Sequence, residues 1–187
     1  MKMKTFDLFT ETERLVLRPL IKDDYSIWLE GFESRYPSRH HHDPGKMDMS
    51  ECTQEWFYDL VDRHQQLAIE DAAHIFGVYR KGDGAHLGMV DFSTLAREDF
   101  QWGRIGYIIH NQHWRNGYGK EAVTAALDMA FKQLAFHRME AHINLDNTAS
   151  IQLAESAGMA FECIRKGFIY ENDKWIDHLV YFKNADH

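Results

Sequence analysis

Apolar and polar residues alternate along several short segments of the chain, which is the pattern of half-buried β-strands. In the first segment, residues 13–20 (ERLVLRPL), Leu15 and Leu17 share one face and Pro19 ends the run. Six later segments have a comparable pattern. These predicted strands span roughly residues 74–80, 86–95, 104–110, 139–145, 160–168 and 174–182.

Apolar residues at intervals of three and four predict helices between these strands. The clearest of them carries one apolar stripe, made of Val123, Ala126, Leu127, Ala130, Phe131 and Leu134. Two further helices are expected after the first strand. Asp23 or Asp24 would cap the earlier one, and Asp48 or Ser50 the later one.

A short helix over residues 148–157, ended by Gly158, completes the set. In chain order the elements are β-α-α-β-β-β-α-β-α-β-β, which predicts an α/β fold with a mixed sheet and helices on both faces. The 187 residues contain no internal repeat, low-complexity tract or flexible linker. We therefore expect a single domain over residues 1–187.

Composition and charge narrow the range of partners. The net charge of −8 argues against nucleic-acid binding, which needs a basic surface, and is compatible with a cationic substrate. Cys52 and Cys163 form no C-x-x-C pair, so we expect no disulfide framework. The N-terminal segment lacks a targeting signature, and no run reaches the ~18 apolar residues of a membrane span. We expect a soluble, cytoplasmic protein that binds neither membrane nor nucleic acid.

A glycine-rich turn, HWRNGYGKEA (residues 113–122), lies between a predicted strand and the clearest helix. Backbone N–H groups from Asn116 to Lys120 would cradle an anion there, and Arg115 would add positive charge. Alternatively, Gly117 and Gly119 only relieve a tight connection. The Walker pattern is absent and the third glycine of the dinucleotide fingerprint is missing, which disfavours both of those nucleotide sites.

Three stretches carry motifs that are specific in combination: IGYIIHNQHWRNGYGKEAV, HRMEAHINLDNTASIQLAESAGMAF and ECIRKG. Together they resemble the GNAT superfamily of N-acetyltransferases, and within it the ribosomal-protein N-terminal acetyltransferase (Rim-type) branch. The opening ERLVLRPL is similar to the same branch, so the resemblance covers residues 12–182. It implies a mostly antiparallel central sheet of about seven strands, the acyl-CoA N-acyltransferase fold, and acetyl-coenzyme A as co-substrate without a metal.

The resemblance also assigns the glycine turn. The final G-x-G of the family's phosphate loop is met by Gly117 and Gly119, while its first position holds Trp114 instead of Gln or Arg. By this resemblance the turn binds the pyrophosphate, and the preceding strand end and the next helix hold the pantetheine. The residues expected to bind the coenzyme are Ile108, Ile109, His110, Arg115, Asn116, Gly117, Tyr118, Gly119, Lys120 and Asn147.

The predicted strand 139–145 has an unusual polar face, formed by Glu140, His142 and Asn144. A central strand beneath helices is normally apolar on both faces, so a cleft would explain this pattern. In the family, the position five residues before Asn147 can hold a general-base glutamate. Here it is His142, which suits base catalysis near neutral pH. The alternative is a core histidine bonded to the backbone.

The acid that protonates the leaving thiolate is the second catalytic question. Many family members place a tyrosine four residues before the glycine matched by Gly158, and here that residue is Ala154. Ser150 fits the Asn-x-x-Ser pattern of the Rim-type branch and lies at a helix N-terminus, where N–H dipoles favour a thiolate. It could also simply support the first helical turn. Tyr107 and Tyr170 are outside candidates.

The segment Arg39-His40-His41-His42-Asp43 has the composition of a metal site. Adjacent histidines seldom face one ion, and the sequence offers no spaced third and fourth ligand. We therefore expect a polar loop and no metal.

The sequence leaves the acceptor open. The Rim-type resemblance favours direct attack by the N-terminal amine of a protein or peptide. The alternatives are a small amine such as a polyamine, aminoglycoside or amino-acid analogue, and a non-catalytic acyl-CoA sensor. Thioester hydrolysis by Cys163 lacks a recognisable His and Asp partner pattern. A monomer and a homodimer are both compatible with the chain.

Overall fold

The computed structural model describes residues 5–186; the start of the segment without a targeting signature, residues 1–4, and residue 187 lie outside this range. The chain forms one eight-stranded sheet in the order β1-β2-β3-β4-β5-β6-β8-β7. Its strands are β1 (Thr10–Glu11), β2 (Leu15–Arg18), β3 (Ala73–Arg80), β4 (His86–Ala96), β5 (Trp102–Ile109), β6 (Arg138–Asn144), β7 (Ala160–Glu171) and β8 (Lys174–Asn184). The helices are α1 (Tyr25–Glu33), α2 (Gln54–Ile69), α3 (Tyr118–Lys132) and α4 (Thr148–Ser156), with 3-10 turns η1 (Lys22–Asp24) and η2 (Asn111–His113).

The predicted element order is confirmed for all seven strands and four helices. The two-residue strand β1 is additional, because a pair this short leaves no readable alternation. The predicted cap of the second helix was wrong. Thr53 caps α2 by accepting the Trp56 N–H at 3.2 Å, whereas Asp48 caps only the Ser50 N–H. Gly158 follows α4 in the left-handed conformation, as expected.

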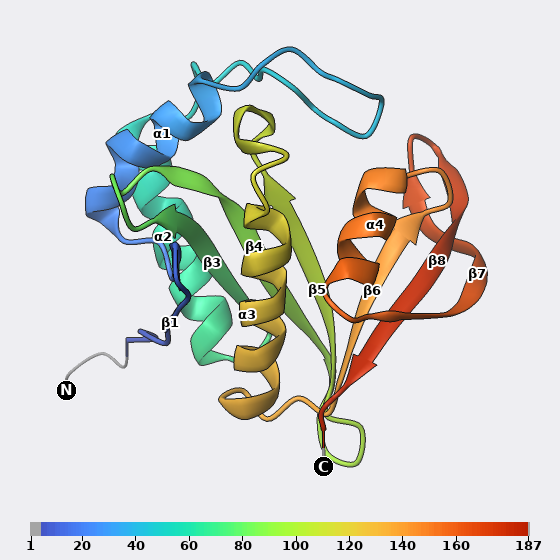
Figure 1. Ribbon diagram of the computed structural model, residues 1–187. Coiled ribbons are helices and arrows are strands. Elements are labelled where there is room, and N and C mark those ends of the chain that lie inside the picture. Colours follow the sequence, from blue (N-terminus) through green and yellow to red (C-terminus); the bar gives the residue numbers. More distant parts are fainter. Residues whose placement is uncertain (1–4, 187) are drawn as a thin grey trace.

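Helices cover the sheet on two sides (Figure 1). On one side α3 and α4 bury the main apolar core against alternate residues of the strands, such as Leu17, Val90 and Met139. On the other side α1 and α2 pack a second cluster around Trp28 and Phe57. No described helix is long and apolar enough to cross a membrane.

The sheet opens in its middle, between β5 and β6. This is the one parallel pairing among the described strands, and it extends only from Trp102 and Arg138 to Arg104 and Glu140. Beyond that point the two strands separate, as Figure 1 shows. The splay leaves the later part of β5 without a strand partner on that side, so its backbone groups are available to a ligand.

Gly106 lies in the splayed part of β5, where the Asp91 side chain of β4 comes close to its backbone. A Cβ at Gly106 would lie 2.6 Å from a carboxylate oxygen of Asp91 on β4, which is nearer than real side chains come. Burial raises the pKa of Asp91, and Arg104 on the same face partly opposes that rise.

A pair of buried histidines joins β4 to the end of β5. His86 Nδ1 and His110 Nε2 are 3.1 Å apart, and the rings pack against Phe32 of α1. Both side chains are almost fully buried. Burial lowers the pKa of His86 to about 4, and burial together with the neighbouring His86 lowers the pKa of His110 to about 2.

The pair predicts loss of stability in mild acid. Because the folded state holds both rings neutral, its histidine pKa values lie below the ordinary 6.5, and stability is complete only above that pH. Below pH 6.5 the unfolded chain binds protons that the folded chain refuses. His86 alone should cost about 3 kcal/mol by pH 4. Urea titrations across this range should show a flatter pH dependence for His86→Asn, and equal slopes would contradict the assignment.

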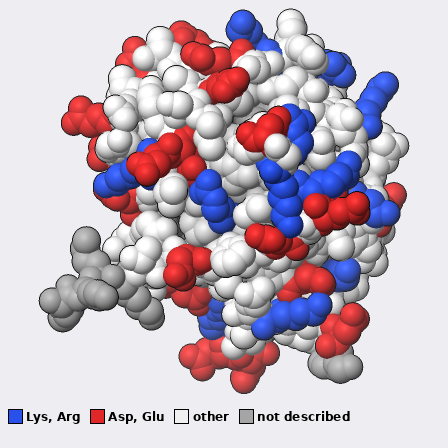
Figure 2. Space-filling model, turned by 60° about the vertical axis from the view of Figure 1, so that its left-hand side comes forward, with Lys and Arg blue, Asp and Glu red and all other residues white. Residues whose placement is uncertain are grey.

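Basic and acidic side chains are interspersed on the face shown in Figure 2, and neither sign forms a broad field there. Several opposite charges are paired, as between Lys81 and Glu11 at 3.0 Å and between Lys22 and Asp62 at 2.8 Å. That face therefore lacks the continuous basic surface that counterion displacement on nucleic acid requires.

Candidate active site

A pocket of about 550 Å³ lies where the splayed end of β5, the N-terminus of α3 and the N-terminal turn of α4 meet. A loop over residues 37–46, here called the roof loop, lies across it. Its lining residues are Arg39, His40, His42, Tyr107, Ile108, Ile109, His113, Trp114, Arg115, Gly117, Tyr118, Gly119, Lys120, Asn147, Ala149, Ser150, Gln152 and Leu153.

The floor of the pocket at α3 has the features of an anion cradle. The first hydrogen bond of α3 runs from the Glu121 N–H to the Gly117 carbonyl, so the N–H groups of Tyr118, Gly119 and Lys120 precede the helical ladder. No side chain caps this helix, and Gly117 adopts a φ of 79°, which favours glycine. Three amide donors therefore converge at the positive end of the helix dipole.

Glu121, in the same first turn, would repel an anion if its charge were free. Burial opposes ionisation of this carboxyl, but hydrogen bonds from Thr12 and Arg14 outweigh burial and keep its pKa below the usual range. The Arg14 guanidinium lies 2.6 Å from the carboxylate and also donates to the Asn116 carbonyl. The pair neutralises the acidic charge and leaves the cradle attractive to phosphate.

Eight of the ten predicted coenzyme-binding residues line this pocket, and their binding role stays a prediction. They are Ile108, Ile109, Arg115, Gly117, Tyr118, Gly119, Lys120 and Asn147. His110 does not line the pocket. Its ring is buried against His86, and its backbone N–H donates to the Leu87 carbonyl. The Asn116 side chain also turns away and donates to the His113 and Trp114 carbonyls of its own turn.

Ser150 lies in the pocket wall and is paired with Tyr107. The Ser150 hydroxyl donates to the Tyr107 oxygen at 3.1 Å, and the Tyr107 hydroxyl donates to the Ser150 carbonyl at 3.0 Å. Burial raises the pKa of Tyr107, which keeps the phenol protonated at neutral pH. The Asn147 side chain caps α4 by accepting the Ser150 N–H at 3.2 Å, which orients the serine. Two hydroxyl groups thus meet in the wall formed by β5 and α4.

His142 lies outside the pocket lining, on the face of β6 turned away from α3 and α4. Its Nε2 is 2.8 Å from a carboxylate oxygen of Glu140, and its ring packs nearly perpendicular to that of Phe168, with centroids 4.9 Å apart. The side chains of Glu140 and His142 are only 2% and 4% exposed. From the sequence, we predicted that a cleft accounts for this polar face. That prediction was incomplete, because Glu140 also forms ion pairs with Arg138 and Arg165.

Glu140 is a carboxylate held by its partners. Burial opposes ionisation, but hydrogen bonds from His142 and Arg138 and the charge of Arg165 outweigh burial and lower the pKa of Glu140 below its usual range. An ionised Glu140 accepts a hydrogen bond from Nε2 of His142 and so holds the ring proton on that nitrogen. In a neutral ring, the other nitrogen, Nδ1, then carries no proton. Nδ1 of His142 is then the nitrogen that can accept a proton.

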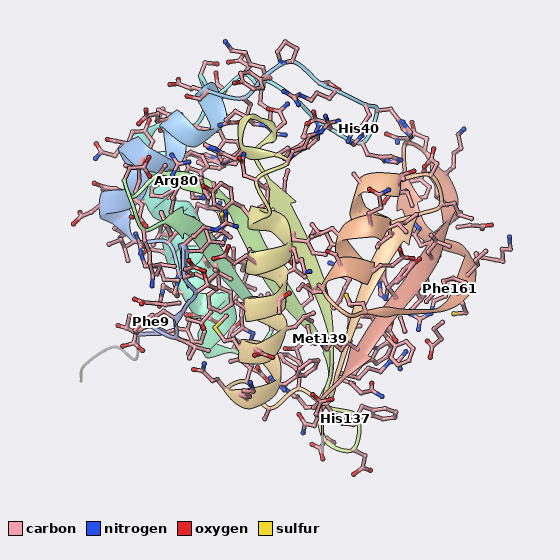
Figure 3. The ribbon with its side chains drawn as sticks, in the orientation of Figure 1. Phe9, His40, Arg80, His137, Met139 and Phe161 are labelled. Carbon is pink, nitrogen blue, oxygen red and sulfur yellow. The ribbon has the colours of Figure 1, made fainter. Side chains whose placement is uncertain are left out.

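The roof loop supplies three lining residues that the sequence did not indicate: Arg39, His40 and His42. The His40 ring stacks on the Trp114 ring, with centroids 5.5 Å apart. In Figure 3, His40 lies on the loop above the space between α3 and α4. The loop is anchored by Asp43, which accepts hydrogen bonds from Arg35 and Asn111 at 3.0 Å each. No periodic pattern marks such residues, because their position depends on tertiary contacts alone.

Comparison with known proteins gives the family. Residues 14–160 match the model of the acetyltransferase (GNAT) domain. The uncharacterized N-acetyltransferase YoaA of Bacillus subtilis is 27% identical over 171 residues, covering 91% of this chain and 93% of that protein. The [ribosomal protein uS5]-alanine N-acetyltransferase of Escherichia coli is 25% identical over 171 residues, covering 90% and 87%. The match to YjcK of Bacillus subtilis, 31% identical over 120 residues, spans 64% of this chain and 66% of that protein.

Among solved structures, RimJ of Mycobacterium smegmatis in complex with CoA-disulfide has the same fold. It superposes with a TM-score of 0.75 at 21% identity, covering 91% of this chain and 82% of that chain. The family match spans most of the sequence and includes the splayed strands, the glycine turn and α3. The chain therefore belongs to the GNAT family of acetyltransferases.

Proposed function

We propose that the protein transfers an acetyl group from acetyl-coenzyme A to the N-terminal amine of a protein or peptide, by direct attack. The carrying observation is the pocket that joins three uncapped amides at the start of α3 to the hydroxyl pair of Tyr107 and Ser150. The amides and the side chains of Arg115 and Lys120 fit a pyrophosphate, and the open edge of β5 suits an amide-bearing arm. Acetyl-coenzyme A supplies the acetyl group as an activated thioester.

Two residues on opposite sides of the splayed strands would move the protons. Ser150, on the α4 side, would donate its hydroxyl proton to the leaving sulfur as the carbon–sulfur bond breaks. His142, on the opposite face of β6, would accept a proton from the attacking amine through Nδ1. Pairing between β5 and β6 stops at Arg104 and Glu140, and His142 lies on β6 just beyond that point.

The choice of a protein N-terminus rests on the relatives. One of them is named a [ribosomal protein uS5]-alanine N-acetyltransferase. The net charge of −8 supports a second candidate, a cationic small amine, because opposite charge attracts such a substrate.

Release of coenzyme A should be followed with acetyl-coenzyme A and a panel of acceptors. The panel holds peptides that begin with Ala, Ser or Met, the same peptides with blocked N-termini, polyamines and aminoglycosides. We expect turnover with free peptides and none with blocked ones. Turnover restricted to small amines would replace the N-terminal proposal with the second candidate. Tight coenzyme binding without turnover on any acceptor would instead favour a sensor.

A further inference from the structure

The roof loop meets the turn between β6 and α4 through two adjacent histidines and one distant aspartate. His41 Nε2 lies 3.0 Å from one carboxylate oxygen of Asp146, and His42 Nε2 lies 2.7 Å from the other. The three candidate ligand atoms all lie within 4.8 Å of one another. The two imidazole rings are 3.8 Å apart between centroids, and each presents its Nε2 to the Asp146 carboxylate.

This donor set has a recognisable chemistry. Two imidazole nitrogens and one carboxylate oxygen are ligands that zinc and similar divalent transition metals accept, at bond lengths of about 2.0–2.2 Å. Without a metal, each imidazole must place an Nε2 proton toward Asp146 to make the observed contacts. A divalent ion would replace those two protons and meet the same three atoms. The third ligand could not be recognised from the sequence, because Asp146 lies far along the chain from the histidines.

Both sides of the cluster are held independently of the cluster itself. On the roof loop, Asp43 follows His42 directly and accepts the backbone N–H groups of Arg39 and Gly45, each at 2.9 Å. On the other side, the Thr148 N–H donates to the Asp146 carbonyl at 3.0 Å and leads into α4. Ligands that the fold already positions reduce the ordering cost of binding an ion.

We propose that His41, His42 and Asp146 bind one divalent transition-metal ion of the zinc class, which fastens the roof loop to the turn before α4. The ion would cross-link the two sides of the pocket entrance, because His42 and the neighbouring His40 line the pocket. Solvent or a bound group completes the coordination. The metal site rests on the cluster alone and does not depend on the proposed acceptor or on coenzyme binding.

Calorimetric titration of the full-length protein with zinc tests the site. We expect one ion per chain in the wild type. His41→Ala, His42→Ala and Asp146→Asn should each weaken binding by roughly 100-fold or more, since even outer-shell partners of a metal contribute 10–100-fold. The matched controls are His40→Ala and Asp48→Asn. The His40 ring stacks on Trp114, and Asp48 is an acidic residue that follows the loop in the sequence. Both controls should bind zinc as the wild type does.

Hydrogen exchange of the roof-loop amides provides a second readout that does not involve activity. Zinc should slow exchange over residues 38–46 in the wild type and leave it unchanged in Asp146→Asn. Two results would overturn the proposal. One is the absence of zinc binding by the wild type, which would identify the cluster as a plain ion pair. The other is binding of equal affinity in the Asp146 and His41 variants, which would place the metal elsewhere.

Discussion

Replacing Ser150 by alanine should slow acetyl transfer by roughly 100-fold, the lower range for loss of a positioned general acid. The affinity for acetyl-coenzyme A should stay unchanged, because the hydroxyl acts on the leaving sulfur and the phosphate cradle lies at α3. The loss should therefore appear in kcat and not in the dissociation constant. Steady-state rates on the preferred acceptor and calorimetry with acetyl-coenzyme A measure the two quantities.

Two variants make this result specific. Ser156→Ala removes a serine at the other end of α4 that donates only to the Leu153 carbonyl, and it should keep the wild-type rate. Tyr107→Phe removes the group that accepts the Ser150 proton in the present arrangement, so it should cost less than Ser150→Ala. A larger loss in Tyr107→Phe would transfer the acid role to the tyrosine. Full activity in both variants would exclude the hydroxyl pair from the chemistry.

Replacing Glu140 by glutamine should lower the free energy of unfolding by about 2–3 kcal/mol. Removing one partner of a buried ion pair costs about 3–5 kcal/mol when the other charge stays buried. Here Arg138 and Arg165 keep 23% and 29% of their side chains exposed, so water can partly solvate them and the cost falls below that range. Chemical denaturation at pH 7 measures the effect.

The stabilisation by Glu140 should depend on pH in a defined direction. Because its folded-state pKa lies below the ordinary 4.5, Glu140 stabilises the fold above that pH, and the contribution is lost as the pH falls through the folded value. The difference between wild type and Glu140→Gln should therefore narrow in acid. Glu162→Gln removes the exposed partner of Arg138, 2.6 Å away, and should cost no more than about 1 kcal/mol. Equal losses in the two variants at pH 7 would contradict a buried network centred on Glu140.

The variant also tests why Glu140 lies beside His142. Without the carboxylate, the proton of His142 is no longer held on Nε2, so a base acting through Nδ1 loses its fixed orientation. The acidic limb of the kcat profile should then shift for Glu140→Gln and stay in place for Glu162→Gln. A profile identical to the wild type would leave His142 with a structural role only.

Local sequence patterns were sufficient to predict the strands and helices of this protein. Strand alternation and helical spacing are set by backbone geometry, so β2 and α3 could be located from Leu15, Leu17 and the apolar stripe of the helix. The glycine turn was predictable for a similar reason, since Gly117 adopts a backbone conformation that other residues avoid.

Features that depend on distant contacts could not be predicted in the same way. Alternation identified Glu140 and His142 as one face of a strand, but it carried no information that arginines on β6 and β7 would close over that face. The histidine run in the roof loop looked isolated because its partner, Asp146, reaches it only through the fold. Likewise, the mutual burial of His86 and His110 follows from the pairing of β4 with β5.

The central claim is that the N-terminus of α3 binds the pyrophosphate of acetyl-coenzyme A while Ser150 lies beside its thioester. Titration of the labelled protein with acetyl-coenzyme A, followed by backbone amide chemical shifts, tests this claim most directly. We predict the largest changes at Tyr118, Gly119 and Lys120, with a second group at Ile108 and Ser150. Saturable binding that leaves the three α3 amides unchanged would contradict the account.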